Sequence, residues 1–478
     1  MDTFVLEAPA PSSPAVVSEL VENVTYDEIA IGRTAALSRV LSREDIELFA
    51  RVSGDTNPAH LDAEYAAGTM FKGVIGHGIW SASIVSAVLG TCLPGPGTIY
   101  LSQDLKFRRP VRPGDKVTAT ITAKEKRDDK KIVVFGCEVT NQAGEVVLSG
   151  DATVIAPSHR VSRPRVHLHE LRVLDHAGHE ALLAKCQGLE PVRAAVVFPT
   201  DEVSLRGAVE AAAAGLIVPL LVGPEAAIRA IAKRHGLDLS AATIVPADDD
   251  VTAAACAVAL VRDGQAEALM KGNLHSDILL AEVVRRESGL RTGRRVSHVF
   301  VMHVPGRKSP LLVTDAAVLM YPTLDEKVDI AQNAIDLAHV LGIDVPRLAV
   351  LSAVETVSAK IPSTLDAAAL TVMAARGQIR GAVVDGPLAF DNAVDPEAAR
   401  IKGIKSDVAG RADILLVPNF EAGNMVAKEL SKIAQADGAG IVMGARCPIV
   451  LTSRSDDERT RVASCAVAVL VAHARRGA

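Results

Sequence analysis

The chain has 478 residues, of which 49% are hydrophobic and only 3% aromatic, and its formal net charge is −6. This length predicts two to four domains, and cores built from Ala, Val, Leu and Ile favour α/β layers. The negative charge excludes the basic signature of a nucleic-acid-binding domain. No uninterrupted apolar run reaches about 18 residues, so we predict no membrane span and no membrane partner.

The first 24 residues contain Pro, Ser and acidic groups but lack the basic and apolar regions of a signal peptide, so we expect a flexible tail. Six cysteines occur without a CxxC motif and mostly in apolar runs, which favours free buried thiols. Together these features predict a cytoplasmic protein. The histidines of residues 156–172 are irregularly spaced and have no Cys or Asp beside them, so we predict a linker and no metal site there (His159, His167 and His169).

A polar turn at residues 53–60 is the strongest candidate for chemistry in the first third of the chain. Asp55 and His60 flank Asn57-Pro58, which signals a turn because a residue before proline leaves the helical region. The turn lets the carboxylate and the imidazole face one point, where they can orient a water molecule and exchange its proton. The structural alternative is an aspartate that caps the turn and a histidine satisfied by local hydrogen bonds.

An apolar run from Ile79 to Leu89 follows directly on His77-Gly78. It is small and apolar nearly all round, so it predicts a buried helix. A helix that begins at Gly78 presents free N–H groups and a positive dipole end. Such an N-terminus suits a carbonyl oxygen that gains negative charge.

A helix is predicted at residues 42–52, with Ser42 and Asp45 forming its cap. Further along the chain, strands are predicted to dominate residues 117–155. Residues 117–124 alternate apolar and polar side chains, and residues 132–140 and 146–155 predict a hairpin. One helix wrapped by an antiparallel sheet is the hotdog layout. Because part of this sheet lacks a partner in the chain, we expect a homo-oligomer, at least a dimer through this domain.

Ordered motifs run through residues 40–157. They are Gly54-Asp55, Asn57-Pro58, His60, Asp62, His77-Gly78, Leu93-Pro94-Gly95, Gly97-Thr98-Ile99-Tyr100, Phe107, Pro110-Val111 and Pro113-Gly114-Asp115. This stretch resembles the R-specific enoyl-CoA hydratases of the MaoC-like hotdog family. The resemblance implies that Asp55 and His60 activate water and that the Gly78 N–H holds the thioester oxygen. It also implies that the substrate site includes Asn57 and Ser86.

From Arg193 onward, short apolar strands alternate with Ala-rich helical stretches. The predicted strands are residues 194–198, 219–222, 243–245, 267–270, 299–303, 311–313, 348–351, 382–384, 414–417 and 449–451. The predicted helices include residues 204–214, 251–261, 324–341 and 365–375. This pattern indicates an open, mainly parallel α/β arrangement, and about ten strands favour two lobes.

Polar residues follow six of these strands, and parallel sheets bind ligands beyond the carboxyl ends of their strands. The ends are Thr200-Asp201, Lys271-Gly272-Asn273, Thr314-Asp315, Asp385-Gly386, Asn419 and Ser453-Arg454. Each end alone also fits loop polarity or helix capping, but together they favour a cleft. The chain has no GxGxxG or GxxxxGK[ST] motif, so neither a dinucleotide fingerprint nor a Walker loop is predicted.

A second set of ordered motifs spans residues 193–471. It comprises Leu269-Met270-Lys271-Gly272, His275-Ser276, Ser297-His298-Val299, Leu312-Val313-Thr314-Asp315-Ala316-Ala317, Glu326-Lys327-Val328-Asp329-Ile330, Asp385-Gly386-Pro387 and Leu451-Thr452-Ser453-Arg454. This half resembles the phosphate acetyl/butyryltransferase family. The resemblance implies two α/β lobes with the site between them, and a last helix that returns to the first lobe.

Acyl transfer between coenzyme A and phosphate needs a cation for phosphate, an oxyanion donor and a thiol base. Arg454 can bind phosphate, and the Ser453 hydroxyl can stabilise the tetrahedral intermediate. The family's acetyl branch places an Asp several residues after the Ser-Arg pair; here the spacing differs, and Asp457 is the candidate base with Asp456 as the alternative. Further candidate substrate-binding residues are Lys271, His275, Ser276, Thr314, Asp315 and Asp385.

These inferences predict a tail (1–24), an α+β hotdog hydratase domain (25–157), a linker with an approach helix (158–190) and a two-lobed three-layer αβα transferase domain (191–478). Lobe I covers about 191–316 and 455–478, and lobe II about 317–454. Coenzyme A thioesters and phosphate are expected as substrates, with no permanently bound cofactor. Two alternatives stay open, namely a hotdog domain that only binds acyl-CoA or dimerises, and a dehydrogenase-like second half.

Overall fold

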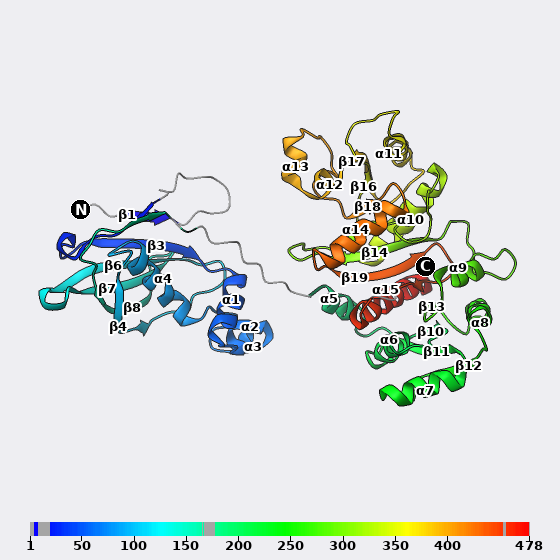
Figure 1. The fold of residues 1–478 in the computed structure, drawn as a ribbon, viewed down its shortest axis with the longest axis horizontal. Coiled ribbons are helices and arrows are strands. Elements are labelled where there is room, and N and C mark those ends of the chain that lie inside the picture. Colours follow the sequence, from blue (N-terminus) through cyan, green and yellow to red (C-terminus); the bar gives the residue numbers. More distant parts are fainter. Residues whose placement is uncertain (1–3, 8–19, 165, 167–176, 453–455, 478) are drawn as a thin grey trace. The chain divides into compact units, whose positions relative to one another are not determined.

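The computed structural model describes residues 4–7, 20–164, 166, 177–452 and 456–477. The chain divides into two compact units, Met1–Leu174 and Asp175–Ala478 (Figure 1). In the described parts of the chain, no helix is long and apolar enough to cross a membrane.

The first unit is a largely antiparallel sheet that packs on one long helix. The strands run in the order β1-β3-β6-β7-β8-β4, with β5 also paired to β8. Their bounds are β1 (Phe4–Glu7), β3 (Thr34–Val40), β4 (Ile99–Gln103), β5 (Lys106–Phe107), β6 (Lys116–Arg127), β7 (Ile132–Asn141) and β8 (Val146–Ile155). Helix α4 (Gly78–Thr91) packs against β3, β6 and β7, which confirms the hotdog layout.

Three short helices precede α4 and position the polar turn. They are α1 (Arg43–Ser53), α2 (Pro58–Leu61) and α3 (Ala63–Gly68). Ser42 caps α1 and forms the predicted capping box with Asp45. Asn57 caps α2, and its side chain accepts from the Ala59 N–H at 3.0 Å.

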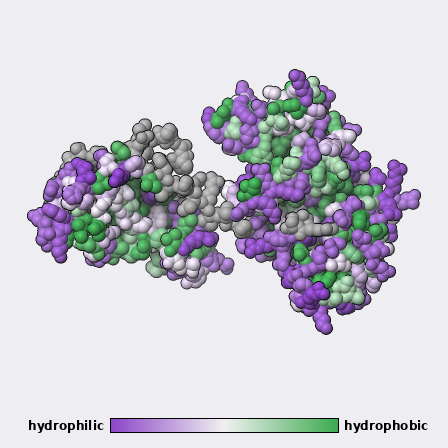
Figure 2. Space-filling model, viewed as in Figure 1, coloured by the Kyte–Doolittle hydropathy of each residue, from purple (hydrophilic) through white to green (hydrophobic). Residues whose placement is uncertain are grey.

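Helix α4 differs from the prediction of a helix buried all round. Trp80, Ile84 and Val88 face the core. On the other side of the helix Ile79 is 54% exposed, and the residues that follow it on that side are also exposed (Ser83, Ser86 and Gly90). The reason is that this sheet covers only one side of a helix whose side chains are small and apolar on every side. Apolar residues of β4 and β5 are exposed as well, namely Ile99, Leu101 and Phe107. Figure 2 shows hydrophobic areas on the surface of this unit.

The predicted tail and linker contain more structure than expected. Within residues 1–24, β1 pairs in parallel with β3, and β2 (Leu20–Glu22) pairs with β9 (Ser162–Pro164). The β-prone residues of β1 extend the open edge that β3 otherwise leaves. Within residues 158–190, β9 belongs to the first unit, whereas α5 (Ala177–Lys185) packs on α15 (Glu458–Arg476) of the second.

The second unit is built on one continuous sheet of eleven strands in the order β12-β11-β10-β13-β20-β19-β14-β15-β18-β16-β17. Their bounds are β10 (Val192–Val197), β11 (Ile217–Gly223), β12 (Thr243–Pro246), β13 (Ala268–Lys271), β14 (Ser297–His303), β15 (Leu311–Thr314), β16 (Arg347–Leu351), β17 (Val383–Leu388), β18 (Ile414–Leu416), β19 (Asp437–Met443) and β20 (Ile449–Val450). Each predicted strand corresponds to an observed one.

Helices cover both faces of this sheet, which confirms the three-layer αβα class. One face carries α5, α6 (Glu202–Ala213), α7 (Glu225–His235), α10 (Leu324–Val340), α11 (Pro362–Ala375) and α15. The other face carries α8 (Asp250–Arg262), α9 (Ser276–Val283), α12 (Phe390–Val394), α13 (Pro396–Ile401) and α14 (Phe420–Lys432). Helix α15 packs on α6, so the last helix returns to the first part of the unit as expected.

The two halves of the sheet run in opposite directions. Strands β12, β11, β10, β13 and β20 are mutually parallel, as are β15, β18, β16 and β17. Between them β19 and β14 pair antiparallel with each other and with their outer neighbours. The six polar strand ends therefore do not meet at one edge as expected, because the reversal sends those after β15, β17 and β18 to the opposite edge.

Candidate active sites

The first unit brings Asp55, His60 and His77 together. One ligand atom from each of these side chains lies within 4.8 Å of the others, and the two imidazole rings are 4.0 Å apart between centroids. Asp55 is exposed, His60 is half-buried and His77 is only 3% exposed. Asp55 and His60 were predicted from the turn, whereas His77 was noted only as part of a motif.

Backbone carbonyls fix the proton positions of both imidazoles. His60 Nδ1 lies 2.9 Å from the Ile75 carbonyl oxygen, and His77 Nε2 lies 3.0 Å from the Asp55 carbonyl oxygen. Because a carbonyl oxygen only accepts, each of these nitrogens donates an N–H. In the neutral form of the ring, His60 Nε2 is then the nitrogen that carries the lone pair, which is what a general base requires.

A cavity of about 270 Å³ adjoins this cluster and is lined by His60, His77, Gly78 and Ser81 together with apolar residues (Phe71, Ile75, Phe107, Val111 and Val147). Gly78 begins α4, so its N–H has no acceptor within the helix. A Cβ on Gly78 would lie 2.9 Å from a Phe107 ring atom. A larger residue at 78 would therefore push Phe107 or close the approach to this N–H.

Two other candidates of the first unit take different positions. Asn57 caps α2 and contacts Asp55 through its own N–H, 3.2 Å from Asp55 Oδ1, so it shapes the turn. Ser86 is exposed two turns along α4 and does not line the cavity, whereas buried Ser81 does. The Asp55, His60 and His77 set, which sequence reasoning did not treat as a metal site, also has donor types that bind divalent ions.

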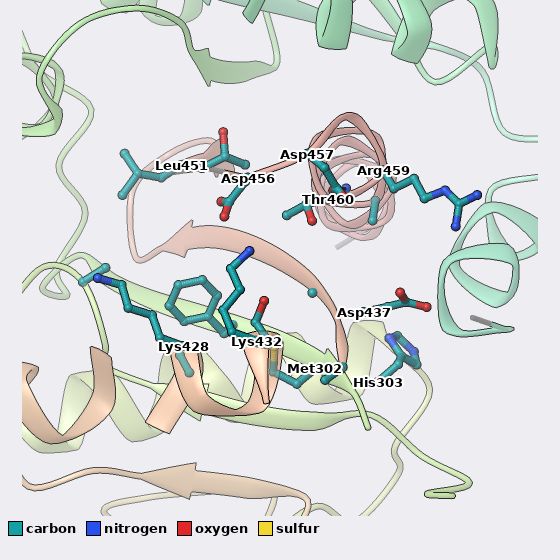
Figure 3. A pocket seen from close by; sticks show the side chains of 18 of the residues that line it. Met302, His303, Lys428, Lys432, Asp437, Leu451, Asp456, Asp457, Arg459 and Thr460 are labelled. Carbon is teal, nitrogen blue, oxygen red and sulfur yellow. Dashed lines mark hydrogen bonds between the residues drawn. The ribbon is translucent and has the colours of Figure 1, made fainter. Parts of the chain in front are cut away.

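The second unit contains a cavity of about 500 Å³ along β14 (Figure 3). Alternate residues of that strand line it, namely His298, Phe300 and Met302, together with His303 at the end of the strand. Helix α14 and the start of α15 form other walls. In Figure 3, Lys428 and Lys432 extend from α14 toward the side where Asp456 and Asp457 lie.

The predicted catalytic residues Ser453 and Arg454 lie outside the described residues. Both flanks of that segment line the cavity, with Leu451 and Thr452 before it and Asp456 and Asp457 after it. Thr452 is buried, and Arg461 of α15 donates from Nη1 to its hydroxyl at 2.8 Å. Buried Arg461, which sequence reasoning missed, therefore connects Thr452, the last described residue before this segment, to α15.

Asp457 is the N-cap of α15, and its Oδ1 accepts from the Thr460 N–H at 2.8 Å. Burial alone would raise the pKa of Asp457, but the hydrogen bonds from Thr460 and the nearby Lys432 and Arg459 charges outweigh it and hold this pKa below its usual range. As a base, Asp457 would have only Oδ2 for a substrate proton. Asp456 lines the same cavity.

Of the other predicted transferase residues, only Ser276 lines the cavity. Thr314 is buried and donates to the His298 carbonyl oxygen at 2.8 Å. The buried Asp315 carboxylate accepts from four backbone N–H groups, those of residues 298, 317, 318 and 319. These two side chains hold the loop beside the cavity in place.

Three further candidates also lie away from the cavity lining. His275 is exposed before α9, and Lys271 is buried with Nζ 3.4 Å from the Gly272 carbonyl oxygen. Asp385 belongs to β17, which β15, β18 and β16 separate from β14. At about 4.8 Å per strand, this places Asp385 roughly 19 Å from the strand that lines the cavity.

His298 is fully buried at the cavity wall. Its Nε2 lies 3.3 Å from the Leu451 carbonyl oxygen, so Nε2 donates, and its Nδ1 has no partner among the described residues. Burial lowers the pKa of His298 from 6.5 to about 4, despite the opposing hydrogen bond to Leu451. The ring is therefore neutral at physiological pH.

Because His298 is buried in its neutral form, we predict that the second unit becomes less stable in acid. Between pH 6.5 and about 4 the unfolded chain gains a proton that folded His298 resists, so the free energy of unfolding should fall by about 3 kcal/mol as pH decreases. Thermal melts of wild type and His298→Gln at pH 7, 6 and 5 measure this. The variant should show the shallower pH dependence, and an equal dependence in both proteins would contradict the prediction.

Comparisons with known proteins agree with this architecture. A family model described as "Phosphate acetyl/butaryl transferase" matches residues 247–469, and a "MaoC like domain" model matches residues 27–143. The phosphate acetyltransferase of Rhizobium meliloti is 59% identical over 300 residues, covering 63% of this chain and 95% of that protein. The phosphate butyryltransferase of Clostridium beijerinckii is 43% identical over 293 residues, covering 61% and 97%.

Among solved structures, a branched-chain phosphotransacylase from Enterococcus faecalis V583 is 29% identical, with a TM-score of 0.51, and covers 59% of this chain and 99% of that one. The fold and the cavity along β14 thus define a phosphotransacylase-type domain that follows a MaoC-like hotdog domain in one chain. The chain belongs to the phosphate acetyl/butyryltransferase family. This membership favours a transferase over the dehydrogenase-like alternative.

Proposed function

We propose that this chain is a bifunctional enzyme of acyl-CoA metabolism. Its second unit is a phosphate acyltransferase, as its family membership supports. Its first unit adds water to trans-2-enoyl-CoA to form R-3-hydroxyacyl-CoA, or runs the reverse reaction. The observation that carries the hydratase half is the Asp55, His60 and His77 cluster beside the free N-terminus of α4.

In the proposed hydration, a water molecule lies between Asp55 and His60. Unprotonated His60 Nε2 takes a proton as the water oxygen bonds to C3, and the proton then reaches C2 through this pair. Negative charge passes to the thioester oxygen as C3 is attacked, and the Gly78 N–H together with the α4 dipole stabilises it. His77 holds the Asp55 backbone and packs on the His60 ring.

In the proposed transfer, a phosphate oxygen attacks the thioester carbonyl carbon, the C–S bond breaks, and the coenzyme A thiolate leaves. The reverse reaction begins with thiolate attack on an acyl phosphate. The family resemblance gives Arg454 the role of phosphate ligand and Ser453 that of oxyanion donor. Asp457, or Asp456 in its place, exchanges the thiol proton.

Lys428 and Lys432 are suited to the phosphate groups of coenzyme A. They stand one turn apart on α14, both are exposed, and neither has a carboxylate partner within 4.0 Å among the described residues. The same cavity offers an apolar wall of Phe300 and Met302 along which a pantetheine arm can pack. An anionic group on a partly apolar ligand fits this arrangement.

Replacing both lysines by glutamine should raise the KM for acyl-CoA roughly 10-fold, because a hydrogen bond to a charged group contributes about 1.5–3 kcal/mol and solvent exposure reduces that value. The KM for an acyl-pantetheine, which lacks the nucleotide phosphates, should stay unchanged. Steady-state kinetics with both thioesters measure the difference. Lys405→Gln is the matched control, since Lys405 is exposed but lies outside the cavity.

The experiment that tests the whole proposal supplies one purified protein with two sets of substrates. Loss of enoyl thioester absorbance reports hydration, and phosphate-dependent release of coenzyme A across an acyl chain-length series reports transfer. Folded protein that releases coenzyme A but hydrates no enoyl-CoA would support the alternative that the hotdog domain only binds acyl-CoA or dimerises. No acyl transfer at any chain length would contradict the transferase half.

The exposed apolar residues of α4, β4 and β5 support a homo-oligomer formed through the first unit. We include this assembly in the proposal, together with the absence of a permanently bound cofactor. Sedimentation velocity of the full chain should show no monomer at micromolar concentration. A monomer that retains hydratase activity would contradict it.

A further inference from the structure

The unpartnered nitrogen of His298 is the feature of the second unit that the proposed acyl transfer does not use. His298 has no exposed surface, lines the cavity, and its Nδ1 has no hydrogen-bond partner among the described residues. Buried polar groups are nearly always satisfied, so such an exception calls for a partner that binds. That partner has to be a hydrogen-bond donor.

Whether Nδ1 donates or accepts a hydrogen bond follows from the contact that the other ring nitrogen makes. Nε2 donates to the Leu451 carbonyl oxygen, so Nδ1 presents a lone pair. Phe300 packs edge-on against the ring at 4.3 Å between centroids, and no Cβ fits at Gly440, where it would lie 2.9 Å from Nε2. The ring is therefore held in one orientation by its surroundings.

Phe300 packs on the His298 ring, and the Leu451 carbonyl accepts from it. Polar side chains, including those of Ser276 and Asn424, line the same cavity, and Leu451 is two residues before the Ser453-Arg454 pair in the sequence. An unpartnered acceptor beside Phe300 matches an acyl chain that carries a hydroxyl group. An unsubstituted acyl chain would leave the acceptor without a partner.

The other unit of the chain indicates which hydroxyl this is. Hydration of an enoyl-CoA places a hydroxyl on C3 of the acyl group and leaves the thioester intact. The product is thus a coenzyme A thioester whose carbonyl can be attacked by phosphate. It differs from a plain acyl-CoA by one hydrogen-bond donor.

We propose that the transferase cavity is selective for 3-hydroxyacyl-CoA over unsubstituted acyl-CoA, and that His298 Nδ1 accepts the hydrogen bond of the 3-hydroxyl. This inference rests on the proposed function. The reaction forms the phosphate O–C bond, breaks the C–S bond and releases coenzyme A, while the hydroxyl is unchanged. The product, a 3-hydroxyacyl phosphate, would be consumed by a phosphoryl transfer to a nucleoside diphosphate or by hydrolysis.

The test compares kcat/KM for R-3-hydroxybutyryl-CoA and butyryl-CoA with phosphate in the full-length protein. Wild type should prefer the hydroxy substrate between about 5-fold and 150-fold, the range that one buried acceptor left unsatisfied produces. The ratio of the two values does not depend on how much of a preparation is folded. A wild-type ratio of one or less overturns the inference.

Two variants locate the effect on Nδ1. His298→Gln can retain a donor to Leu451 but lacks the ring Nδ1, so its ratio should fall to about one. His298→Asn can present an acceptor closer to the backbone, where Nδ1 lies, so it should keep part of the preference. His339→Gln is the control, because it removes another imidazole of the second unit that contacts a backbone carbonyl but lies outside the cavity, so it should leave the ratio unchanged.

The outcomes separate this inference from the proposed function. No transfer of either acyl group by wild type contradicts the transferase itself. Transfer of both acyl groups with equal losses in His298→Gln means that Nδ1 serves the thiol or the fold, and this overturns the proposed selectivity. A preference that persists in His298→Gln assigns the hydroxyl contact to another residue and also overturns it.

Discussion

Asp55→Asn and His60→Ala should each lower kcat for enoyl-CoA hydration by a factor of about 10² or more. His60 supplies the unprotonated Nε2, since its Nδ1 donates to Ile75, and Asp55 supplies the second group on the same water. Because the two act on one proton transfer, the double variant should lose little more than either single one. The measurement is the steady-state loss of enoyl thioester absorbance.

Asp62→Asn is the matched control for the Asp55 substitution. Asp62 lies two residues beyond His60 and caps α3 by accepting from the Glu64 and Tyr65 N–H groups, a role that asparagine can also fill. Its activity should stay near that of wild type, and both catalytic variants should retain phosphate-dependent coenzyme A release. Near-normal hydration by folded Asp55→Asn would remove Asp55 from the mechanism.

Adding a chelator to the same experiment distinguishes catalysis by proton transfer from metal-assisted catalysis. Asp55, His60 and His77 have donor types that a divalent ion could bind. If the reaction runs by proton transfer alone, dialysis against a chelator leaves hydration unchanged. Loss of activity that Zn²⁺ or Mn²⁺ restores would replace the water-activation mechanism with a metal-assisted one.

The catalytic turn could be predicted because its signals are local. Asn57-Pro58 fixes a turn, and a turn of that length brings residues 55 and 60 to one side. His77 completes the cluster across 17 to 22 residues of chain, through its contact with the Asp55 carbonyl. A contact of that range has no periodicity or spacing that would reveal it in one sequence.

The α/β half shows the same division between local and long-range information. Strand positions follow from short apolar runs, so each predicted strand was found. Strand direction depends on pairing, and the antiparallel β14, β15 and β19 reverse the second half of the sheet. Strand order is equally long-range information: Asp385 was expected in the cleft, but β17 is the edge strand and lies four strands from β14.

The α14 wall of the cavity and buried Arg461 were missed for a related reason. Lys428 and Lys432 are four residues apart, a spacing that places them on one face of a helix but does not say what that face contacts. Arg461 would have been expected on the surface as a charged helix residue, yet it is buried against Thr452. Gly207 leaves the space for it, since a Cβ there would lie 2.9 Å from Arg461 Cδ.

Ser453→Ala and Arg454→Gln should each reduce acyl transfer by about 10² to 10³, with hydration unchanged. The alternative was that Ser453 caps the last helix. The structure gives that cap to Asp457, whose Oδ1 accepts from Thr460, and α15 begins at Glu458. A cap or an exposed ion pair would in any case contribute about 1 kcal/mol to stability and little to rate.

An oxyanion donor or a phosphate ligand acts on the barrier instead, where losing one donor costs about 2.7–4 kcal/mol. Transfer rates should therefore fall steeply while the melting temperature stays close to that of wild type. In Arg454→Gln the KM for phosphate should rise more than the KM for acyl-CoA, because the guanidinium is assigned to phosphate. Arg459→Gln tests whether charge alone suffices, since Arg459 lines the same cavity. An equal loss in Arg459→Gln, or transfer within a few-fold of wild type in both primary variants, would move the catalytic groups elsewhere along β14.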